Sequence, residues 1–503
     1  MIVHHLKEHG ITFEQLLPFA KEILLLESLK LATLEPQLKA LYAQDGRGRK
    51  PKEPLKMLQS LLLMNLQGEV SFTRWVRTTR TNPLMAVLSG FSPQDTPGVG
   101  TYYDFLNRLE DGPFKPQCKH YLRPSQRESG KHLRDVKAEK LDSDKEINRT
   151  AQLVETLLKQ VEQPNPDDLQ NRLQSYLKEI ALHPSIEKGL IDPKCLDITG
   201  DGSTVVSGSA ENGKPACQCR QNKIYKCPCP KYYSDRTAQW GYDSYRKVYY
   251  FGHRFYQLCT STSGHDLPLS ITIEPANQSD YTLSVKTLDR FLKSSPDFKI
   301  NRCTLDAGHD SMAHYEYLEA KTILPVIALN PRTKVESVDR TLSNKGIPLC
   351  PAGIEMTYHG RDKHKRKHVY HCPAKKKARN GDSWTVVTDI KRCPLGVLCQ
   401  PDSRLGPLVS VSEADNPRVF PAIRRHSKEY TRLMNLRSGV ERSNAMKKTV
   451  YKLEGSQFKR SSRFLIKLYL IAMIEHATAW LSEDKKTTGF SEKELLKALF
   501  DTC

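Results

Sequence analysis

Three acidic residues lie in short segments whose composition suits metal-ion chemistry. Asp201 lies in ITGDGST, Asp306 follows the strand-like run RCTL, and Glu441 lies in LRSGVERSNAMKK. Carboxylate oxygens are the ligands that Mg²⁺ prefers, and two ions about 3.5 to 4 Å apart can activate a nucleophile and stabilise the leaving oxygen of a phosphodiester. The three carboxylates are therefore candidates for two-metal phosphoryl transfer.

Each of these carboxylates also has a purely structural explanation. Asp201 precedes Gly and Ser and could shape a turn, and Asp306 could cap a following helix. Glu441 lies four residues after Arg437, so the two could form an ion pair along a helix. Asp197 has the same strand parity as Asp201 and is a weaker alternative ligand. Spacing alone does not decide between these explanations.

The net charge of the chain favours a polyanionic partner. The 503 residues include 77 Lys and Arg against 57 Asp and Glu, a formal net charge of +20. Such a basic surface favours nucleic acid, which releases counterions on binding, although it could also serve only solubility. We expect no membrane association and a cytoplasmic location, because the sequence has neither an uninterrupted apolar run of about 18 residues nor a signal peptide at its start.

Basic residues around Glu441 could hold the phosphates of such a partner. Arg437, Glu441 and Lys448 advance by one and then two helical turns, so they share one face of a helix. A carboxylate between two cations can bind metal while the cations bind phosphate. Histidines near the acidic segments could contact phosphate or metal, or be structural; they are His253, His265 and His309.

The cysteines include a candidate metal site. Two Cys-x-Cys pairs, separated by seven residues, are formed by Cys217, Cys219, Cys227 and Cys229. Four thiolates could close around a structural Zn²⁺, or the residues could be free thiols in an exposed loop. A second, more widely spaced set is Cys350, Cys372, Cys393 and Cys399.

The elements that must position these residues follow from the apolar pattern. Residues 11–110 carry Leu, Ile and Met at three- and four-residue spacing, which predicts helices and is compatible with helix-turn-helix DNA binding. β-Branched and aromatic runs from residue 195 onward alternate with helical segments, which predicts a mixed α/β domain. We therefore expect a helical DNA-binding domain at 1–115, a charged linker and helical spacer at 116–189, an α/β core at 190–330, a Cys- and Lys-rich insertion at 331–420, and closing helices with a tail at 421–503.

Four blocks of the sequence resemble DDE transposases of bacterial insertion sequences, in the broad group that includes the IS4, IS5 and IS1182 families. The first is GRGRKPKEPLKMLQSLLLMNLQGEVSFTRWVRTTRTNPLMAVLSGF with GVGTYYDFLNRL; the others are ITGDGSTV, GHDLPLSITIEPANQSDYTL with TLDAGHDS, and RSGVERSNAMKK. The last block keeps the family spacing of Arg, three residues, Glu, six residues and Lys. Met434 replaces the tyrosine that often precedes this arginine by three residues.

The resemblance implies a fold, a reaction and roles for particular residues. The α/β fold would be an RNase H-like catalytic core split by a β-rich insertion and preceded by an all-α DNA-binding region. Asp201, Asp306 and Glu441 would hold two Mg²⁺ or Mn²⁺ ions as the catalytic residues. The residues expected to bind DNA are Arg437, Arg442, Lys448 and Trp384, the last by stacking on a flipped base, although Trp384 could instead be a core residue of a small β domain.

The resemblance also implies partners. The enzyme would cut the ends of an insertion sequence and join the 3′-OH to target DNA, and its double-stranded DNA partners would be terminal inverted repeats and target DNA, bound as a homodimer. Two alternatives are a non-catalytic DNA-binding protein derived from a transposase and an RNase H-like nuclease without strand transfer. All three carboxylate blocks are present, which favours the enzyme.

Overall fold

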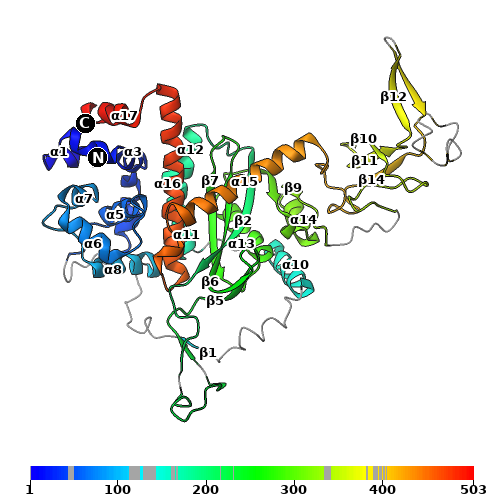
Figure 1. The fold of residues 1–503 in the computed structure, drawn as a ribbon. Coiled ribbons are helices and arrows are strands. Elements are labelled where there is room, and N and C mark those ends of the chain that lie inside the picture. The colour runs from blue at the N-terminus through cyan, green and yellow to red at the C-terminus, as the bar shows by residue number, and fades with distance from the viewer. Residues whose placement is uncertain are drawn as a thin grey trace. The chain divides into compact units, whose positions relative to one another are not determined.

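A computed structural model describes most of the chain, and its described residues form two units (Figure 1). The described residues are 2–42, 50–112, 125–127, 143–159, 165, 168–215, 217–229, 231–332, 341–380, 383–388, 393, 395, 399, 403 and 405–502. The first unit comprises Met1–Ile300 and Leu436–Cys503, and the second comprises Asn301–Asn435. Each unit is described by itself.

The first unit begins with a set of helices, as the apolar spacing predicts. Ser71 caps α6 by accepting a hydrogen bond from the amide of Arg74, and Asn82 caps α7 through the amide of Leu84. A buried serine, Ser60, links three of the helices because its hydroxyl contacts both the indole of a tryptophan on α6 and a tyrosine on α8. The helices are α1 (Ile2–Glu8), α2 (Phe13–Leu16), α3 (Ala20–Ser28), α4 (Glu35–Lys39), α5 (Pro54–Leu66), α6 (Phe72–Thr81), α7 (Pro83–Leu88) and α8 (Val99–Asp111).

The spacer that follows contains helices and one short strand. Its described elements are β1 (Ser125–Arg127), α10 (Ser143–Lys159), α11 (Leu169–Leu177) and α12 (His183–Glu187). The strand β1 was not expected from the polar composition of this region; it pairs in antiparallel fashion with β4 (Lys231–Tyr233), which also pairs with β3 (Lys214–Pro215). Within the expected linker and spacer at 116–189, residues 116–124, 128–142, 160–164 and 166–167 lie outside the described residues.

The sheet of the first unit is built around one long strand, β6 (Val248–Thr260). One edge of β6 pairs with β2 (Leu196–Val206), and its other edge pairs with β5 (Gln239–Asp243) and then β7 (Leu267–Pro275), all in antiparallel register. Most residues of β6 and β7 are buried on both faces of the sheet, including polar ones such as Gln257 and Ser270. This register places Asp201 of β2 directly opposite Gln257 of β6.

Helices cover this sheet and connect it to the N-terminal helices. The helix α13 (Asp280–Ser294) packs on β6 and β7, and α16 (Ser461–Thr488) packs on β7 and also on α3, α5 and α11 (Figure 1). By length and composition α16 could cross a membrane, but 94% of its most apolar window is buried inside the protein, as in a core helix. The remaining helices are α15 (Lys428–Thr449), whose residues from Leu436 onward belong to this unit, and α17 (Glu492–Thr502).

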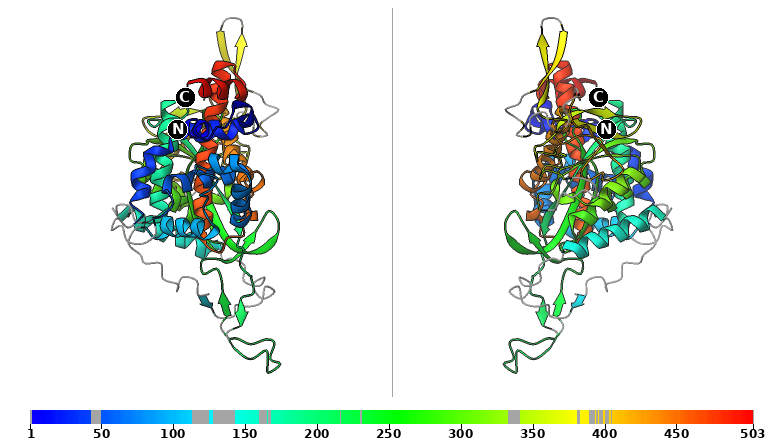
Figure 2. Two further views of the ribbon diagram at one scale, coloured as in Figure 1. Left: turned by 90° about the vertical axis from the view of Figure 1, so that its left-hand side faces the viewer. Right: turned by 90° about the vertical axis from the view of Figure 1, so that its right-hand side faces the viewer.

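The second unit contains a parallel strand pair and a small antiparallel sheet. The strand β8 (Ile300–Leu305) pairs in parallel with β9 (Leu324–Ile327), and α14 (Met312–Ala320) connects them. The strands β10 (Thr357–Asp362), β11 (Lys367–His371) and β14 (Val409–Ser412) form the small sheet. A separate hairpin of β12 (Lys375–Asn380) and β13 (Ser383–Thr388), yellow in the ribbon, is seen from two further sides in Figure 2. All five of these last strands fall within the expected insertion.

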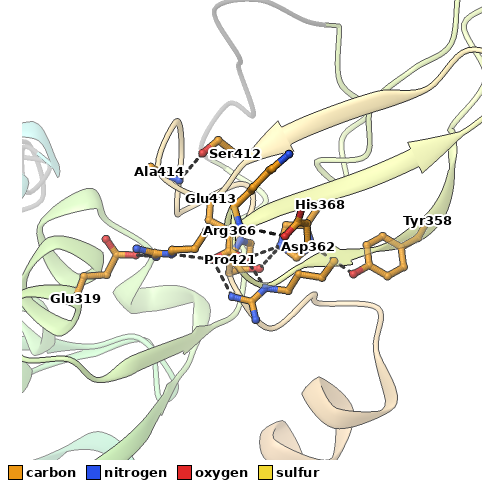
Figure 3. A network of polar contacts seen from close by, with 11 residues as sticks. Glu319, Tyr358, Asp362, Arg366, His368, Ser412, Glu413, Ala414 and Pro421 are labelled. Carbon is orange, nitrogen blue, oxygen red and sulfur yellow. Dashed lines mark hydrogen bonds and ion pairs between the residues drawn. The ribbon is translucent and has the colours of Figure 1, made fainter.

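A buried carboxylate of the second unit forms a network of polar contacts beside the small sheet (Figure 3). Glu413, whose side chain is 1% exposed, accepts hydrogen bonds from Arg361 at 3.0 Å and Arg366 at 3.2 Å. The ring of His368 lies 3.5 Å from the same carboxylate, and Arg366 also pairs with Glu319 of α14 at 3.1 Å. Burial would raise the pKa of Glu413, but hydrogen bonds from Arg361 and Arg366 outweigh it and hold that pKa below its usual value.

Candidate active site

The carboxylate of Asp201 faces α15. The side-chain amide of Asn444 donates a hydrogen bond of 3.2 Å to Asp201 Oδ2. Asn444 is buried, and its Oδ1 has no hydrogen-bond partner among the described residues. This contact joins two blocks that are more than two hundred residues apart in the sequence, the strand ITGDGSTV and the helix RSGVERSNAMKK.

A buried polar network holds α15 in this position. Gln257, opposite Asp201 on the sheet, donates to Ser443 Oγ at 2.9 Å, and Ser443 donates to Glu475 of α16 at 2.8 Å. Lys447 donates to Ser443 at 2.7 Å and forms an ion pair with Glu475. Because Lys447 and Glu475 are both buried, each needs the other charge to be stable in the interior. The network therefore fixes the rotation of α15 against β6 and α16.

Glu441 lies on the same stripe of α15 as Asn444. Its carboxylate accepts an ion pair from Arg437 Nη2 at 2.8 Å and is 49% exposed. The structural explanation of Glu441 as a partner of Arg437 is therefore realised, but the exposed carboxylate is also accessible to a ligand. Lys448, one turn beyond Asn444, donates to Thr204 Oγ1 of β2 at 3.2 Å, and burial lowers its pKa.

Arg442 is directed to a different part of the unit. Its guanidinium makes two hydrogen bonds of 2.8 Å to the carboxylate of Asp266, in the turn between β6 and β7. Gly439 allows this close approach, because a Cβ there would lie 2.0 Å from Ser261 Oγ and 2.3 Å from Asp266 Oδ1. The helix thus meets the turn through Gly439 and Arg442.

Asp306 belongs to the second unit, directly after β8. Its Oδ1 lies 2.5 Å from Nδ1 of His309, whose ring is 2% exposed, whereas Asp306 itself is 42% exposed. Asp306 occupies the N-cap position of a short 3₁₀ turn but makes no side-chain capping hydrogen bond there. The next aspartate in the segment, Asp310, is buried and paired with Arg418 at 2.8 Å, so it has a structural role.

The three candidate carboxylates share one local property. Each contacts a donor from its own unit: Asn444 for Asp201, Arg437 for Glu441 and His309 for Asp306. In the first unit, Asp201 and Glu441 offer hard carboxylate oxygen atoms, to which Asn444 Oδ1 adds an unpartnered buried oxygen. Such oxygen atoms are the ligands that Mg²⁺ and Mn²⁺ prefer, whereas soft metals prefer thiolates.

Comparison with known protein families identifies the family to which the chain belongs. Residues 186–474 match the family model described as "Transposase DDE domain", which spans β2, β8, all of α15 and the first half of α16. The chain belongs to the DDE transposase family. Residues 13–108, the N-terminal helices, match a second model described as "Transposase domain (DUF772)". Both the DDE resemblance and the transposase assignment of the helical region are thereby confirmed.

Other comparisons add little to this assignment. No curated protein sequence matches the transposase significantly. A solved structure, the cryo-EM structure of a piggyBac transposase synaptic complex with hairpin DNA, is similar at 11% sequence identity over 73% of this chain and 74% of that chain. The TM-score of 0.28 is too low to establish a shared fold.

The first cysteine set is brought together in the transposase. The sulfur atoms of Cys217, Cys219, Cys227 and Cys229 all lie within 4.8 Å of one another. Two of the sulfur pairs lie 3.5 Å and 3.7 Å apart, too far for a disulfide bond. The Cys219 backbone amide and neighbouring thiols lower the pKa of Cys217 to about 7, and hydrogen bonding to Cys217 and Cys229 raises the pKa of Cys219 to about 12. This cluster could hold a structural ion.

Other residues singled out from the sequence lie elsewhere. The second cysteine set forms no comparable group of three or more among the described residues; two of its members, Cys372 and Cys393, pack in one small apolar cluster. His253 is fully buried against Asp235 and is structural. Trp384 lies on β13 opposite Arg379, and its side chain is outside what the structure describes.

Asn444 is the site residue that sequence reasoning missed. Its position three residues after Glu441 and four before Lys448 places it on their helical face, so the periodicity of the block contained the signal. An asparagine carries no charge, so the charge pattern of the block does not mark it as a partner for a carboxylate.

Proposed function

We propose that this chain cuts the ends of an insertion sequence and joins the freed 3′-OH to target DNA. The observation that carries the proposal is the hydrogen bond between Asn444 and Asp201, which fastens the strand block to the Glu441 helix within a family-matched transposase domain. The proposal extends to an RNase H-like fold for the α/β core and to convergence of Asp306 with the other two carboxylates.

Two Mg²⁺ or Mn²⁺ ions are part of the proposal, with Asp201, Asp306 and Glu441 as their ligands. Bound ions of this kind supply Lewis-acid charge that activates a hydroxyl nucleophile and stabilises the leaving oxygen. The chain's own residues prepare for this: Asn444 orients the carboxylate of Asp201, and His309 orients that of Asp306.

Two cations of α15, Arg437 and Lys448, are proposed to bind DNA phosphate. Arg437 neutralises Glu441 in the protein alone, and on ligand binding its guanidinium is released toward DNA phosphate. Lys448 stays anchored to Thr204 of β2 and places a second cation along the same helical face. In-line phosphoryl transfer depends mainly on such positioning and on charge.

DNA recognition and assembly complete the proposed function. The N-terminal helices would bind terminal inverted repeats, and a homodimer would bring two ends together. Arg442 and Trp384 would contact DNA, although Arg442 would first have to leave Asp266. We also propose that the four clustered cysteines hold one structural Zn²⁺, since their sulfur separations agree with the roughly 3.8 Å expected for tetrahedral thiolates about 2.3 Å from zinc.

The test is cleavage and joining of oligonucleotides that carry the element's own ends, in Mg²⁺ or Mn²⁺. We expect 3′-OH ends and joined products that disappear in Asp201→Asn, Asp306→Asn and Glu441→Gln. Two exposed acidic residues of the second unit provide matched controls, Asp415→Asn and Glu316→Gln, and both should retain activity. Tight end binding without strand breakage would favour a DNA-binding protein without catalysis, and cleavage without joining would favour a nuclease.

A further inference from the structure

The cysteine cluster closes a loop with an unusual charge distribution. Residues 212–234 contain five Lys and Arg residues and no Asp or Glu. Within it, the loop 217–229 exposes three cations, Arg220, Lys223 and Lys226. None of these three forms an ion pair with a described residue, whereas Arg442 and Lys447 elsewhere in the same unit are both paired.

The loop has no apolar core that would hold it together. Its two large apolar side chains point outward, with Ile224 51% and Tyr225 76% exposed. Backbone hydrogen bonds define a tight turn, in which the amide of Ile224 donates to Cys219 at 2.9 Å and Lys223 adopts a left-handed φ of 61°. The four sulfur atoms are therefore the main internal contact that fixes this turn.

A metal on these sulfurs would fix the cations at the tip. Closing the loop fixes the seven-residue segment between Cys219 and Cys227 that carries Arg220, Lys223 and Lys226, and three like charges in so short a segment are stabilised by a polyanion. Tyr225 stands between two of these cations in the sequence and offers a flat apolar face. Figures 1 and 2 show the segment as a green loop that extends away from the sheet of the first unit.

We propose that the metal-closed loop 217–229 is a DNA-backbone clamp in which Arg220, Lys223 and Lys226 bind phosphates and Tyr225 packs against an adjacent sugar or base. The inference rests on the proposed function in that the polyanion is taken to be DNA. Arg supplies a planar fork for phosphate oxygens and Lys a point charge, whereas the contacts described carry no base-specific geometry. The clamp therefore binds duplexes of any sequence.

The binding experiment uses the full chain and a labelled duplex of about 30 base pairs with a random sequence, titrated at several NaCl concentrations. We expect the triple variant Arg220→Gln, Lys223→Gln, Lys226→Gln to bind at least about tenfold more weakly near 100 mM salt, with a log–log salt slope shallower by about 2.7. The matched control, Lys194→Gln, Lys493→Gln, Lys497→Gln, removes the same charge from exposed positions outside the N-terminal helices and should bind more tightly than the loop variant. Equal affinity and slope in the two triple variants would overturn the clamp.

Metal content tests the closure of the loop separately. Elemental analysis should find one zinc per chain, retained by the loop triple variant and by Cys195→Ser at an exposed cysteine, and lost in Cys217→Ser, Cys219→Ser. The double cysteine variant should bind the random duplex as weakly as the triple variant. An intact mass lower than that of the fully reduced chain, by the hydrogen atoms lost when two disulfide bonds form, would overturn the metal closure. The absence of bound metal after incubation with Zn²⁺ would overturn it as well.

The outcomes distinguish this inference from the proposed function. Loop-dependent duplex binding without end cleavage would retain the clamp and reject the transposition reaction. End cleavage and joining with unchanged random-duplex binding in the loop variant would retain the transposition reaction and reject the clamp.

Discussion

At the scale of single residues, the site depends on an uncharged side chain beside a carboxylate. Asn444 holds Asp201 by one hydrogen bond and stands between Glu441 and Lys448 on α15. The types and spacing of the charged residues could be predicted from the sequence, because helical periodicity places 437, 441 and 448 on one face. The bond to Asp201 could not be predicted, because it depends on the packing of α15 against β2 and no local pattern reports that.

Replacement of Asn444 tests this positioning role. Asn444→Ala should slow strand cleavage by about ten- to a hundredfold and raise the Mn²⁺ concentration needed for half-maximal rate, because Asp201 is no longer oriented. Titration of the cleavage rate with Mn²⁺ measures both effects. An unchanged metal requirement, together with a lower unfolding free energy, would assign Asn444 a structural role only.

A second residue-scale prediction concerns acid stability. His476 of α16 is fully buried. Its Nδ1 forms a hydrogen bond with the hydroxyl group of Ser185, and its Nε2 lies 2.8 Å from the carbonyl oxygen of Pro268. Burial lowers its pKa from 6.5 to about 4, so the unfolded chain takes up this proton first as pH falls. The unfolding free energy should therefore decrease between pH 6.5 and about 4, by up to about 3 kcal/mol.

Urea unfolding at several pH values measures this dependence. In the variant His476→Asn, the decrease in unfolding free energy that this histidine causes should disappear. The control variant His364→Asn, at an exposed position, should show the same decrease as the wild type. A pH dependence that is identical in both variants would contradict the assignment.

At the scale of elements, the approach of α15 to the β6–β7 turn depends on one glycine. A Cβ at position 439 would lie 2.0 Å from Ser261 Oγ, so Gly439→Ala should push the helix away and destabilise the unit by about 1–3 kcal/mol. The shift should also reduce cleavage, because Glu441 and Asn444 move with the helix. Gly100→Ala is the control: that glycine begins α8 and a Cβ there meets nothing within 4 Å. Equal unfolding midpoints for both variants would count against this packing.

Most elements near the site could be predicted from their sequence patterns. The β-branched and aromatic residues of β6 and β7 and the apolar spacing of the N-terminal helices are local signals. The short strands β1, β3 and β4 could not be predicted, because two or three polar residues carry no strand pattern and pair only through chain segments that meet in the fold. Likewise, the pairing of Lys447 with Glu475 joins two helices whose order in the sequence does not reveal their contact.

At the scale of the whole molecule, the chain divides into two units with separate polar anchors. The segment expected as an insertion, 331–420, lies entirely within the second unit, which also includes β8 and α14. Composition is the basis for expecting an insertion there, because Cys, Lys and Pro are frequent in this segment. It did not indicate that Asn301–Asn435 forms one compact unit, since this follows from long-range contacts such as Glu413 with Arg361 and Arg366.

Loss of the buried carboxylate of Glu413 should destabilise the second unit and leave the stability of the first unit unchanged. Glu413→Gln removes the buried negative charge that the partly exposed Arg361 and the exposed Arg366 share, and should destabilise this unit by about 1–2 kcal/mol. Hydrogen exchange should become faster in peptides from 357–413 and stay unchanged in α16. Because the pKa of Glu413 is lowered in the folded state, the wild-type unit should lose stability as pH falls through that lowered pKa. Uniformly faster exchange across both units would contradict this prediction.

The burial of α16 has a consequence for synthesis of the protein. This helix packs against three helices from the first half of the chain and against β7, yet its residues, 461–488, leave the ribosome after all of them. Until then, the apolar surfaces of α3, α5 and β7 lack their partner and are exposed to chaperones and proteases. A chain truncated before residue 461 should therefore be degraded, because these apolar surfaces stay uncovered.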